Sequence, residues 1–406
     1  MTGTDTKMQH VVVALSGGVD SSTAAALLVQ QGYQVSGVTM RLWTAQRIPP
    51  KRNAATASRR LLGEAVPGDQ FPADRCCAPD SVEDARQVCA RLGIPFHLVD
   101  LEGEFKARVV DYFCDSYALG RTPNPCLACN REIKFKALLR IVRDWGVDYL
   151  ATGHYARIRV QNGQYQLFRG ADRQKDQSYV LYRLGQEELP HLLFPLGGYS
   201  KHQVRAMATS FGLPTADKAE SQDACFLSRG DYRAFLAQER PETMRVGPIL
   251  DVQGRVLGEH RGVAFYTVGQ RQGTGLTAAH PLYVVEIDPA RNALIVGPKA
   301  ALLRRELLAE EVHFVAGHPP PAEAGCDVSP SLGRGSTRLQ PIPITAKIRY
   351  KAEEAAAKLI PLPGQKARVV FATPQPAITP GQGVVFYQDE VVIGGGIITS
   401  TMPMEV

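Results

Sequence analysis

The sequence predicts an α/β protein: an N-terminal doubly wound parallel sheet, then a small β-rich domain, then a C-terminal antiparallel β-barrel. Three observations support this fold class. Apolar strands and amphipathic helices alternate up to about Arg229, which is typical of a parallel sheet covered by helices. Short strands separated by glycines then replace that alternation. Further short strands lie on either side of a loop-like stretch rich in Pro, Gly and Ser, residues 317–335, and they predict a barrel.

Length and composition set the outer limits of this prediction. A chain of 406 residues is too long for one ordinary core, and we expect domains at residues 1–229, 230–302 and 303–406. A hydrophobic share of 44% and a charged share of 21% are those of a soluble globular protein. Because no apolar run approaches the roughly 18 residues of a membrane span, we expect a cytoplasmic protein without a membrane partner. An organellar protein that has lost its transit peptide would look the same.

Charge and cysteine content narrow the possible partners. A formal net charge of +6 is compatible with a polyanionic partner, although many basic proteins bind no nucleic acid. Eight cysteines in a cytosolic chain of this length favour chemistry or ordinary burial over a disulfide framework.

A candidate phosphate-binding loop follows the first apolar strand. The run from His10 ends in Ser16-Gly-Gly-Val-Asp-Ser-Ser22, and an alanine- and leucine-rich helix follows. A glycine turn at a helix N-terminus offers free N–H groups and the positive end of the helix dipole to a polyanion. Gly17 and Gly18 permit close approach of the backbone, and the serines supply hydroxyls. Asp20 would hold a magnesium ion or orient the loop; the alternative is a turn that binds nothing.

The motif lacks the lysine of the kinase-type P-loop. It resembles instead the Ser-Gly-Gly-x-Asp-Ser loop of enzymes that split ATP between the α and β phosphates and adenylate an oxygen. The next predicted strand, residues 34–43, would place Met40 beside this loop, where an adenine ring could lie, because ligands of open α/β sheets bind at the carboxyl ends of strands. The alternative for Met40 is an ordinary core position. Residues 44–75, basic and without periodicity, predict a long mobile surface loop.

The remaining elements follow in order along the chain. Capping boxes predict helix starts at Ser81 and at Ser200. His154 follows the strand 148–152 at the same edge as the phosphate loop and is either a ligand contact or structural. Asn162-Gly163 predicts a hairpin turn within residues 155–169. The other predicted helices are 81–92, 104–118 and 132–145, and the other predicted strands are 94–100, 247–252, 263–268, 282–287, 344–350, 367–371 and 384–387.

Three cysteines lie in segments that suggest chemistry. Two X-Pro pairs in residues 122–125 predict an extended loop that delivers Cys126 and Cys129 just before a helix, where a thiolate is stabilised and its pKa lowered. A zinc site with Cys76 and Cys77 would have poor ligand spacing, and inert burial is another alternative; we favour redox or sulfur-transfer chemistry. Cys225 lies in a charged and polar segment, where a buried structural cysteine is unusual.

In these segments the chain resembles the tRNA-specific 2-thiouridylases, which replace the C2 oxygen of the wobble uridine in certain tRNA anticodons with sulfur. The resemblance implies an adenine-nucleotide α-hydrolase-like sheet, ATP and magnesium as cofactors, and tRNA and a persulfide sulfur donor (a cysteine desulfurase or a sulfur-relay protein) as partners. The matching segments cover almost the whole chain, in the family's order: 16–22, 122–135, 153–157, 175–182, 220–226, 266–275 and 381–387.

Carried over by position, the resemblance also assigns roles to individual residues. Cys129 would be the nucleophile and Cys225 the carrier of the persulfide, and sulfur transfer would leave a disulfide between them. The implied ATP contacts are Ala14, Leu15, Ser16, Gly17, Gly18, Val19, Asp20, Ser21, Met40 and Gly153. The implied tRNA contacts are Asn124, Pro125, Cys126, His154, Lys175, Asp176, Gln177, Arg349, Tyr350 and Gln382.

One departure from the family pattern affects the chemistry. Well-known members carry an aspartate where this chain has Cys126, so any acid–base role of that carboxylate would pass to a thiol or to another residue, or be dispensable. Loop 44–75 and insertion 317–335 also look longer than expected. The rival functions are a tRNA thiolase acting on another base, an adenylating synthetase that would leave the cysteines idle, and a non-catalytic tRNA-binding protein.

Overall fold

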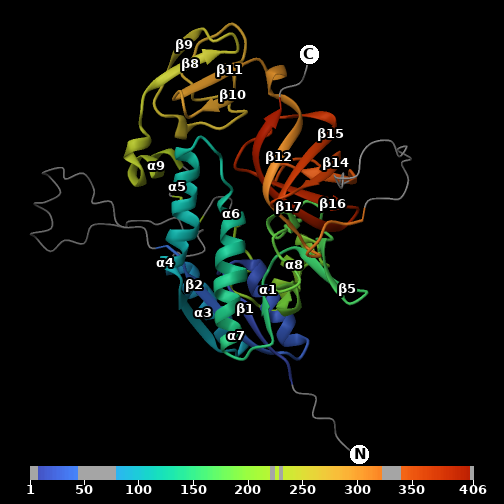
Figure 1. Ribbon diagram of the computed structural model, residues 1–406. Helices are drawn as coiled ribbons and strands as arrows, with labels where there is room; N and C mark the ends of the chain where they lie inside the picture. Colours follow the sequence, from blue (N-terminus) through green and yellow to red (C-terminus); the bar gives the residue numbers. More distant parts are fainter. Residues whose placement is uncertain (1–7, 44–78, 220–224, 228–231, 322–339, 403–406) are drawn as a thin grey trace, which may run out of the picture.

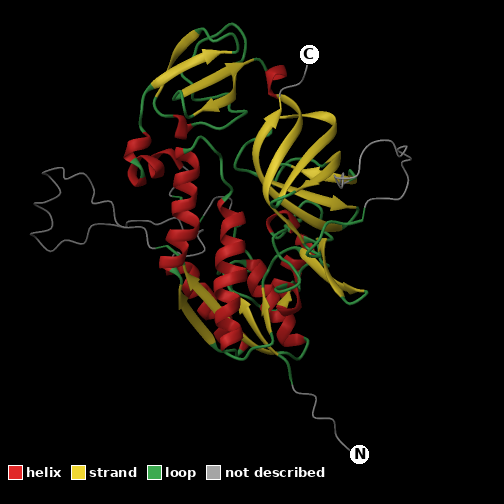
Figure 2. Ribbon diagram, in the orientation of Figure 1, coloured by secondary structure: helices red, strands yellow, loops and turns green. Residues whose placement is uncertain are grey.

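The computed structural model describes residues 8–43, 79–219, 225–227, 232–321 and 340–402 (Figure 1). These residues form a five-stranded, a four-stranded and an eight-stranded sheet. Figure 2 draws their strands in yellow. The predicted fold class is therefore confirmed. The predicted loop 44–75, Cys76 and Cys77, the domain boundary near residue 229 and most of insertion 317–335 lie outside the described residues. Among the described helices, none is both long enough and apolar enough to span a bilayer.

The five-stranded sheet of the N-terminal domain is parallel, with the strand order β3-β2-β1-β4-β7. Because β1 lies between β2 and β4, the connections diverge on either side of its carboxyl end, which is where open α/β sheets bind ligands. The strands are β1 His10–Ala14, β2 Gln34–Arg41, β3 Phe96–Asp100, β4 Tyr149–Ala151 and β7 Leu192–Leu193.

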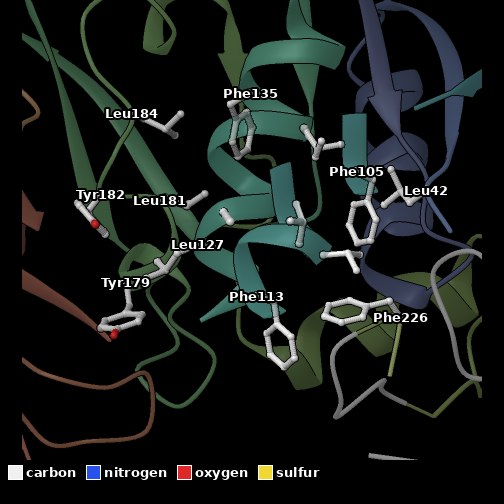
Figure 3. Close-up of a cluster of buried hydrophobic side chains, with 14 of the residues drawn as sticks. Leu42, Phe105, Phe113, Leu127, Phe135, Tyr179, Leu181, Tyr182, Leu184 and Phe226 are labelled. Carbon is white, nitrogen blue, oxygen red and sulfur yellow. The ribbon is translucent and has the colours of Figure 1, made fainter. Parts of the chain in front are cut away.

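Helices cover both faces of this sheet, and alternate residues of β1 show it. Val11 and Val13 pack with α1 and α3, whereas Val12 belongs to the cluster that includes Phe105 and Leu138 on the other face, seen in part in Figure 3. The helical segments are α1 Val19–Gln30, α3 Pro79–Leu92, α4 Glu102–Phe105, η1 Lys106–Val110, α5 Asp111–Ala118, α6 Pro125–Ala128, η2 Cys129–Leu138, α7 Leu139–Asp144, η3 Ser178–Val180, η4 Leu189–His191 and α8 Lys201–Ser210.

Two predicted helix starts are wrong and one is confirmed. The helix expected from residue 132 begins at Pro125 and runs through α6, η2 and α7, so the two cysteines lie within it rather than in a preceding loop. Helix α3 begins at Pro79, which puts Ser81 inside the helix. The capping box at Ser200 is present, with its hydroxyl accepting from the Gln203 N–H.

The four-stranded sheet belongs to the small central domain and has the order β10-β11-β8-β9. The expected strand 263–268 is wrong: Val263–Phe265 form the 3₁₀-helix η7, and all three side chains are buried. Its apolar residues reflect core packing rather than strand pairing. The other elements of this domain are α9 Tyr232–Glu239, η6 Pro241–Thr243, β8 Gly247–Asp251, β9 Val256–His260, β10 Tyr283–Asp288, β11 Ala293–Gly297 and η8 Lys299–Leu302.

The C-terminal strands form an antiparallel barrel that is closed by pairing of β12 with β17. Its interior includes Leu307, Leu359 and Phe386, all fully buried. The barrel strands are β12 Leu303–Phe314, β13 Ile342–Lys347, β14 Ala355–Leu362, β15 Lys366–Pro376, β16 Gly383–Gln388 and β17 Val391–Met402.

A hairpin of the N-terminal domain extends the sheet of the barrel. Strands β5 Ala156–Gln161 and β6 Gln164–Arg169 turn at Asn162-Gly163, where both residues have positive φ, 53° and 76°, as predicted. Strand β6 pairs with β17, so the barrel is tied to the N-terminal domain by backbone hydrogen bonds.

Arg169 stabilises this junction. It is only 2% exposed, it makes two hydrogen bonds to the Glu354 carboxylate, and its guanidinium lies 3.6 Å from the centre of the Tyr387 ring. Its Nε donates to the Asp389 carbonyl at 3.2 Å. A buried cation is therefore shared between the hairpin and the barrel.

We expect Arg169→Met to destabilise the protein by about 3 kcal/mol, because it leaves the Glu354 carboxylate without its buried cation. The matched control is Arg173→Met, since Arg173 pairs with Glu390 at the surface and such pairs contribute less than about 1 kcal/mol. Thermal unfolding midpoints measure the difference. Equal midpoints for the two variants would show that the junction does not depend on Arg169.

Candidate active site

The phosphate loop connects β1 to α1 with the geometry that the motif predicts. Gly17 has a φ of +69°, and a Cβ at this position would lie 2.4 Å from the Ser81 carbonyl oxygen, so only glycine fits. Gly18 is the N-cap of α1 and has no side chain to cap the first turn. The N–H groups of that turn lack intrahelical acceptors and are available to an anion.

The loop hydroxyls bond to one another and to the backbone. Ser16 Oγ and Ser21 Oγ are 3.2 Å apart, and both Ser21 and Ser22 donate to the Gly18 carbonyl, at 3.2 and 2.9 Å. This network fixes the curvature of the loop. Gly153, after β4, approaches it closely, because a Cβ there would lie 2.7 Å from the Ser21 nitrogen.

Asp20 is held by two residues that the sequence analysis missed. Lys201 Nζ contacts both carboxylate oxygens, at 2.7 and 2.9 Å, and the Tyr155 hydroxyl donates to Oδ1 at 2.7 Å. The capping box at Ser200 puts Lys201 at the first position of α8, and this was the available sequence signal. These contacts join Asp20 to α8 and to the start of the hairpin, and its two expected roles, holding a magnesium ion or orienting the loop, stay predictions.

Strand β2 ends beside the loop, as predicted. Leu15 N–H donates to the Val38 carbonyl at 2.8 Å, and the Thr39 hydroxyl donates to the Leu15 carbonyl at 3.1 Å. Met40 is the next residue and is half-buried. Its side chain thus belongs to the carboxyl end of β2, beside the turn.

Cys126 and Cys129 lie in the first turns of the long helix that begins at Pro125. Asn124 is the N-cap, with its side-chain oxygen accepting from the Cys126 N–H at 3.0 Å. Cys126 is exposed and Cys129 is half-buried. Although Cys126 reaches the surface, desolvation by surrounding protein raises the pKa of its thiol, opposed by Lys134. The expected lowering of the pKa is therefore not found at Cys126.

All three domains meet at Thr122, just before this helix. Its N–H donates to the Pro380 carbonyl at 2.8 Å, and its carbonyl accepts from Gln382 Nε2 at 2.9 Å; both partners belong to the barrel. Its hydroxyl donates to the Thr267 hydroxyl of the central domain at 3.1 Å. The cysteine-bearing helix end is thereby fixed to the other two domains.

Cys225 is half-buried and packs on the same hydrophobic cluster as Cys129. The neighbouring Phe226 anchors this short described segment, with its ring centre 5.2 Å from that of Phe113 and 6.0 Å from that of Phe105 (Figure 3). Both cysteines thus border one core, although the residues on either side of 225–227 are outside the described part of the chain.

His154 links the loop to the cysteine helix. It follows Gly153, and its ring centre lies 5.8 Å from that of Phe135, which belongs to η2. Its Nδ1 is 2.6 Å from the Thr152 hydroxyl. Burial lowers the pKa of His154 well below its usual value, and Lys134 lowers it further, so the imidazole is neutral at physiological pH.

The other residues assigned to tRNA fall into two groups. Asp176 is buried and accepts from the N–H groups of Gly170 and Ser178, both at 3.0 Å, so its carboxylate serves the fold, while Lys175 beside it is half-buried. Gln177, Arg349, Tyr350 and Gln382 are partly exposed but have partners within the protein: the Tyr155 N–H for Gln177, the Thr379 hydroxyl for Arg349, the Tyr179 ring for Tyr350 and the Thr122 carbonyl for Gln382. Within the described residues, no group of three or more His, Cys, Asp or Glu side chains is arranged to hold a metal ion.

These observations define a class: an α/β nucleotide-binding protein whose phosphate loop is linked to a cysteine-bearing helix. Comparison with known proteins gives the family. The chain matches models described as the tRNA methyl transferase HUP domain over residues 9–229, the tRNA methyl transferase PRC-barrel domain over 233–298 and the aminomethyltransferase beta-barrel domain over 304–398.

Curated relatives match nearly end to end. A tRNA-specific 2-thiouridylase MnmA from Moorella thermoacetica is 48% identical, covering 96% of this chain and 99% of the relative. Another with that name, from Roseiflexus castenholzii, is 45% identical over the same shares. A solved 4-thiouridine synthetase–RNA complex with bound ATP is 18% identical with a TM-score of 0.31, covering 58% of this chain and 51% of that one. The chain belongs to the tRNA-specific 2-thiouridylase family.

We expect Asp20→Asn and Lys201→Met each to cost about 1.5–3 kcal/mol, because each leaves a half-buried charge without its hydrogen-bonded partner. The double variant should lose less than the sum of the two, since both changes break one interaction. Thermal unfolding provides the cycle, and Lys106→Met, which breaks the exposed pair with Asp111, is the control. Additive losses would mean that Lys201 does not act through Asp20.

Proposed function

We propose that this protein catalyses the ATP-dependent 2-thiolation of the wobble uridine in tRNA anticodons, with sulfur supplied by a cysteine persulfide. One observation carries the proposal: the phosphate loop, Gly153, His154 and the cysteine-bearing helix form a continuous chain of contacts. In this proposal residues 1–229 form the domain that carries out the ATP chemistry. Residues 230–302 form the small central domain, and residues 303–406 form the barrel, which provides part of the tRNA-binding surface.

The first step follows from the poor leaving ability of a urea-like carbonyl oxygen. The C2 oxygen of the uridine attacks the α-phosphorus of ATP, and pyrophosphate leaves from the loop Ser16–Ser22, whose amides take up its charge. The other assigned ATP contacts, Ala14, Leu15, Met40 and Gly153, surround this loop at the carboxyl ends of the strands. Magnesium would neutralise charge on the ATP phosphates, and Asp20, which pairs with Lys201 in this structure, is the residue that would hold it.

The second step replaces the activated oxygen by sulfur. The terminal sulfur of a Cys225 persulfide attacks C2, and AMP departs with the former C2 oxygen. The Cys129 thiolate then attacks the Cys225 sulfur, which breaks the sulfur–sulfur bond, leaves the thiocarbonyl on the base and forms a Cys129–Cys225 disulfide. Alternatively, Cys129 attacks the persulfide first and releases sulfide. Both routes end in a disulfide that an external dithiol reduces.

The chemistry of the chain separates this proposal from its rivals. Methyl transfer, which the names of two of the matching family models suggest, has no use for a pyrophosphatase-type loop. A synthetase would use the loop and leave Cys129 and Cys225 idle. A non-catalytic RNA-binding protein would use neither.

Conversion of ATP to AMP, measured with and without tRNA and a persulfide donor, tests the function. We expect AMP formation to require tRNA, and 2-thiouridine to appear only when the persulfide donor is also present. Thiolation of a different nucleoside would favour the rival thiolase. AMP formation on a small-molecule acceptor would favour a synthetase, and the absence of AMP under every condition would favour a binding protein.

The three cysteines should separate by role. Cys225→Ser should accept no labelled sulfur from a persulfide donor and should make no 2-thiouridine. Cys129→Ser should still take up label on Cys225 yet make no product, because the bound sulfur cannot be resolved. Cys126→Ser should keep measurable activity. Mass spectrometry of each variant after one turnover measures the label. An active Cys129→Ser together with an inactive Cys126→Ser would show that Cys126, not Cys129, is the nucleophile.

A further inference from the structure

A cavity of about 620 Å³ lies where the central domain, with its helix α9, meets the barrel. It is lined by residues 267–270, 272 and 273 of the glycine loop 267–273, by Tyr232 and Arg233 of α9, and by Arg349 after β13. The described lining residues include two arginines and no aspartate or glutamate. This volume is in the range of pockets that hold a small organic ligand, and the charge favours an anionic one.

The two arginines border the same glycine loop. A Cβ at Gly273 would lie 3.5 Å from Arg233 Nη2, and a Cβ at Gly269 would lie 3.7 Å from Arg349 Nη2. Arg349 Nη2 is fixed by the Thr379 hydroxyl at 2.6 Å and by the Ala377 carbonyl. The cationic side of the cavity is therefore ordered before any ligand binds.

The loop itself is also preformed. Gly269 N–H donates to the Val284 carbonyl at 2.8 Å, and the Val284 N–H donates to the Gln270 carbonyl at 2.9 Å. The Gln270 side chain accepts from the Thr267 N–H at 3.2 Å and donates to the Gln272 carbonyl at 2.8 Å. A ligand in this cavity would meet a rigid wall, which reduces the entropy cost of binding.

The cavity is joined to the cysteine-bearing helix by a short path. Thr267 in its wall bonds to Thr122, and Cys126 is the fourth residue after Thr122, a span of about 14 Å at most if the chain is fully extended. An RNA whose target base lies at the cysteines would therefore bring neighbouring nucleotides to this cavity. Aromatic and cationic side chains are typical contacts of unpaired nucleotides. Arg233 lies 5.4 Å from the centre of the Tyr232 ring, and since one face of that ring is stacked on Tyr117, with centres 4.9 Å apart, a base would meet its other face or its edge.

We propose that this cavity binds an unpaired nucleotide of the RNA substrate, within a few positions of the modified base, with Arg233 and Arg349 facing its phosphate. The inference rests on the proposed RNA-modifying function. It adds Tyr232, Arg233 and the loop 267–273 to the RNA-binding surface. It also separates this site from the ATP site, because none of its lining residues belongs to the phosphate loop.

The test uses the full-length protein and a stem–loop RNA that carries the target uridine. Arg233→Gln should weaken binding about 5- to 10-fold and reduce the slope of log K against log salt by about 0.7, the value for one phosphate contact on single-stranded nucleic acid. Arg261→Gln removes the same charge from an exposed residue of the same domain outside the cavity lining, and should change binding less than twofold. The two variants should have similar unfolding midpoints and ATP affinities.

Methylphosphonate substitution at single loop phosphates then locates the contact. One phosphate near the target should weaken wild-type binding when neutralised, and the same neutralisation should have little effect on Arg233→Gln. Equal effects at every phosphate in both proteins would overturn the proposal, as would weaker ATP binding by Arg233→Gln with unchanged RNA binding. Thiolation of full-length tRNA by the wild type is measured separately. If the proposed function is wrong, no 2-thiouridine forms. If only the cavity proposal is wrong, 2-thiouridine forms but neutralising each phosphate weakens binding equally in the wild type and in Arg233→Gln.

Discussion

The candidate site depends on the hydrogen bonds that Thr122 makes to the other two domains. Its N–H and carbonyl bond to the barrel, and its hydroxyl bonds to the central domain. Because the helix with Cys126 and Cys129 begins three residues later, the position of both thiols is set by all three domains at once. The barrel packs closely against Thr122, since a Cβ at Gly381 would lie 2.8 Å from the Thr122 nitrogen. A catalytic domain alone would lack these constraints.

The same logic holds at the phosphate loop, where long-range contacts complete what the local sequence begins. The motif Ser16–Ser22 determines the turn, and its geometry was predicted because glycine and helix N-terminus chemistry are local. Lys201 and Tyr155, which hold Asp20, come from distant parts of the chain. No periodicity or spacing could reveal them, although the confirmed capping box placed Lys201 at a helix start.

The errors of the sequence analysis have physical causes. The X-Pro pairs before Cys126 suggested an extended loop, but Pro125 occupies the first helical position, where its missing N–H costs nothing and Asn124 caps the helix. Residues 263–268 have a strand-like composition, yet three of them form a buried 3₁₀-helix because tertiary packing outweighs β propensity. The pairing of β6 with β17 joins residues more than 200 apart in sequence and left no local signal.

The central claim is that ATP activates the C2 oxygen of the uridine before sulfur arrives. A tRNA carrying ¹⁸O at C2 of the target uridine tests it most directly, with the AMP from a single turnover analysed by mass spectrometry. If the C2 oxygen attacks the α-phosphorus, the account predicts one ¹⁸O atom in the phosphate of each AMP released per 2-thiouridine formed. AMP without ¹⁸O, alongside 2-thiouridine that has lost its label, would contradict adenylation of the base.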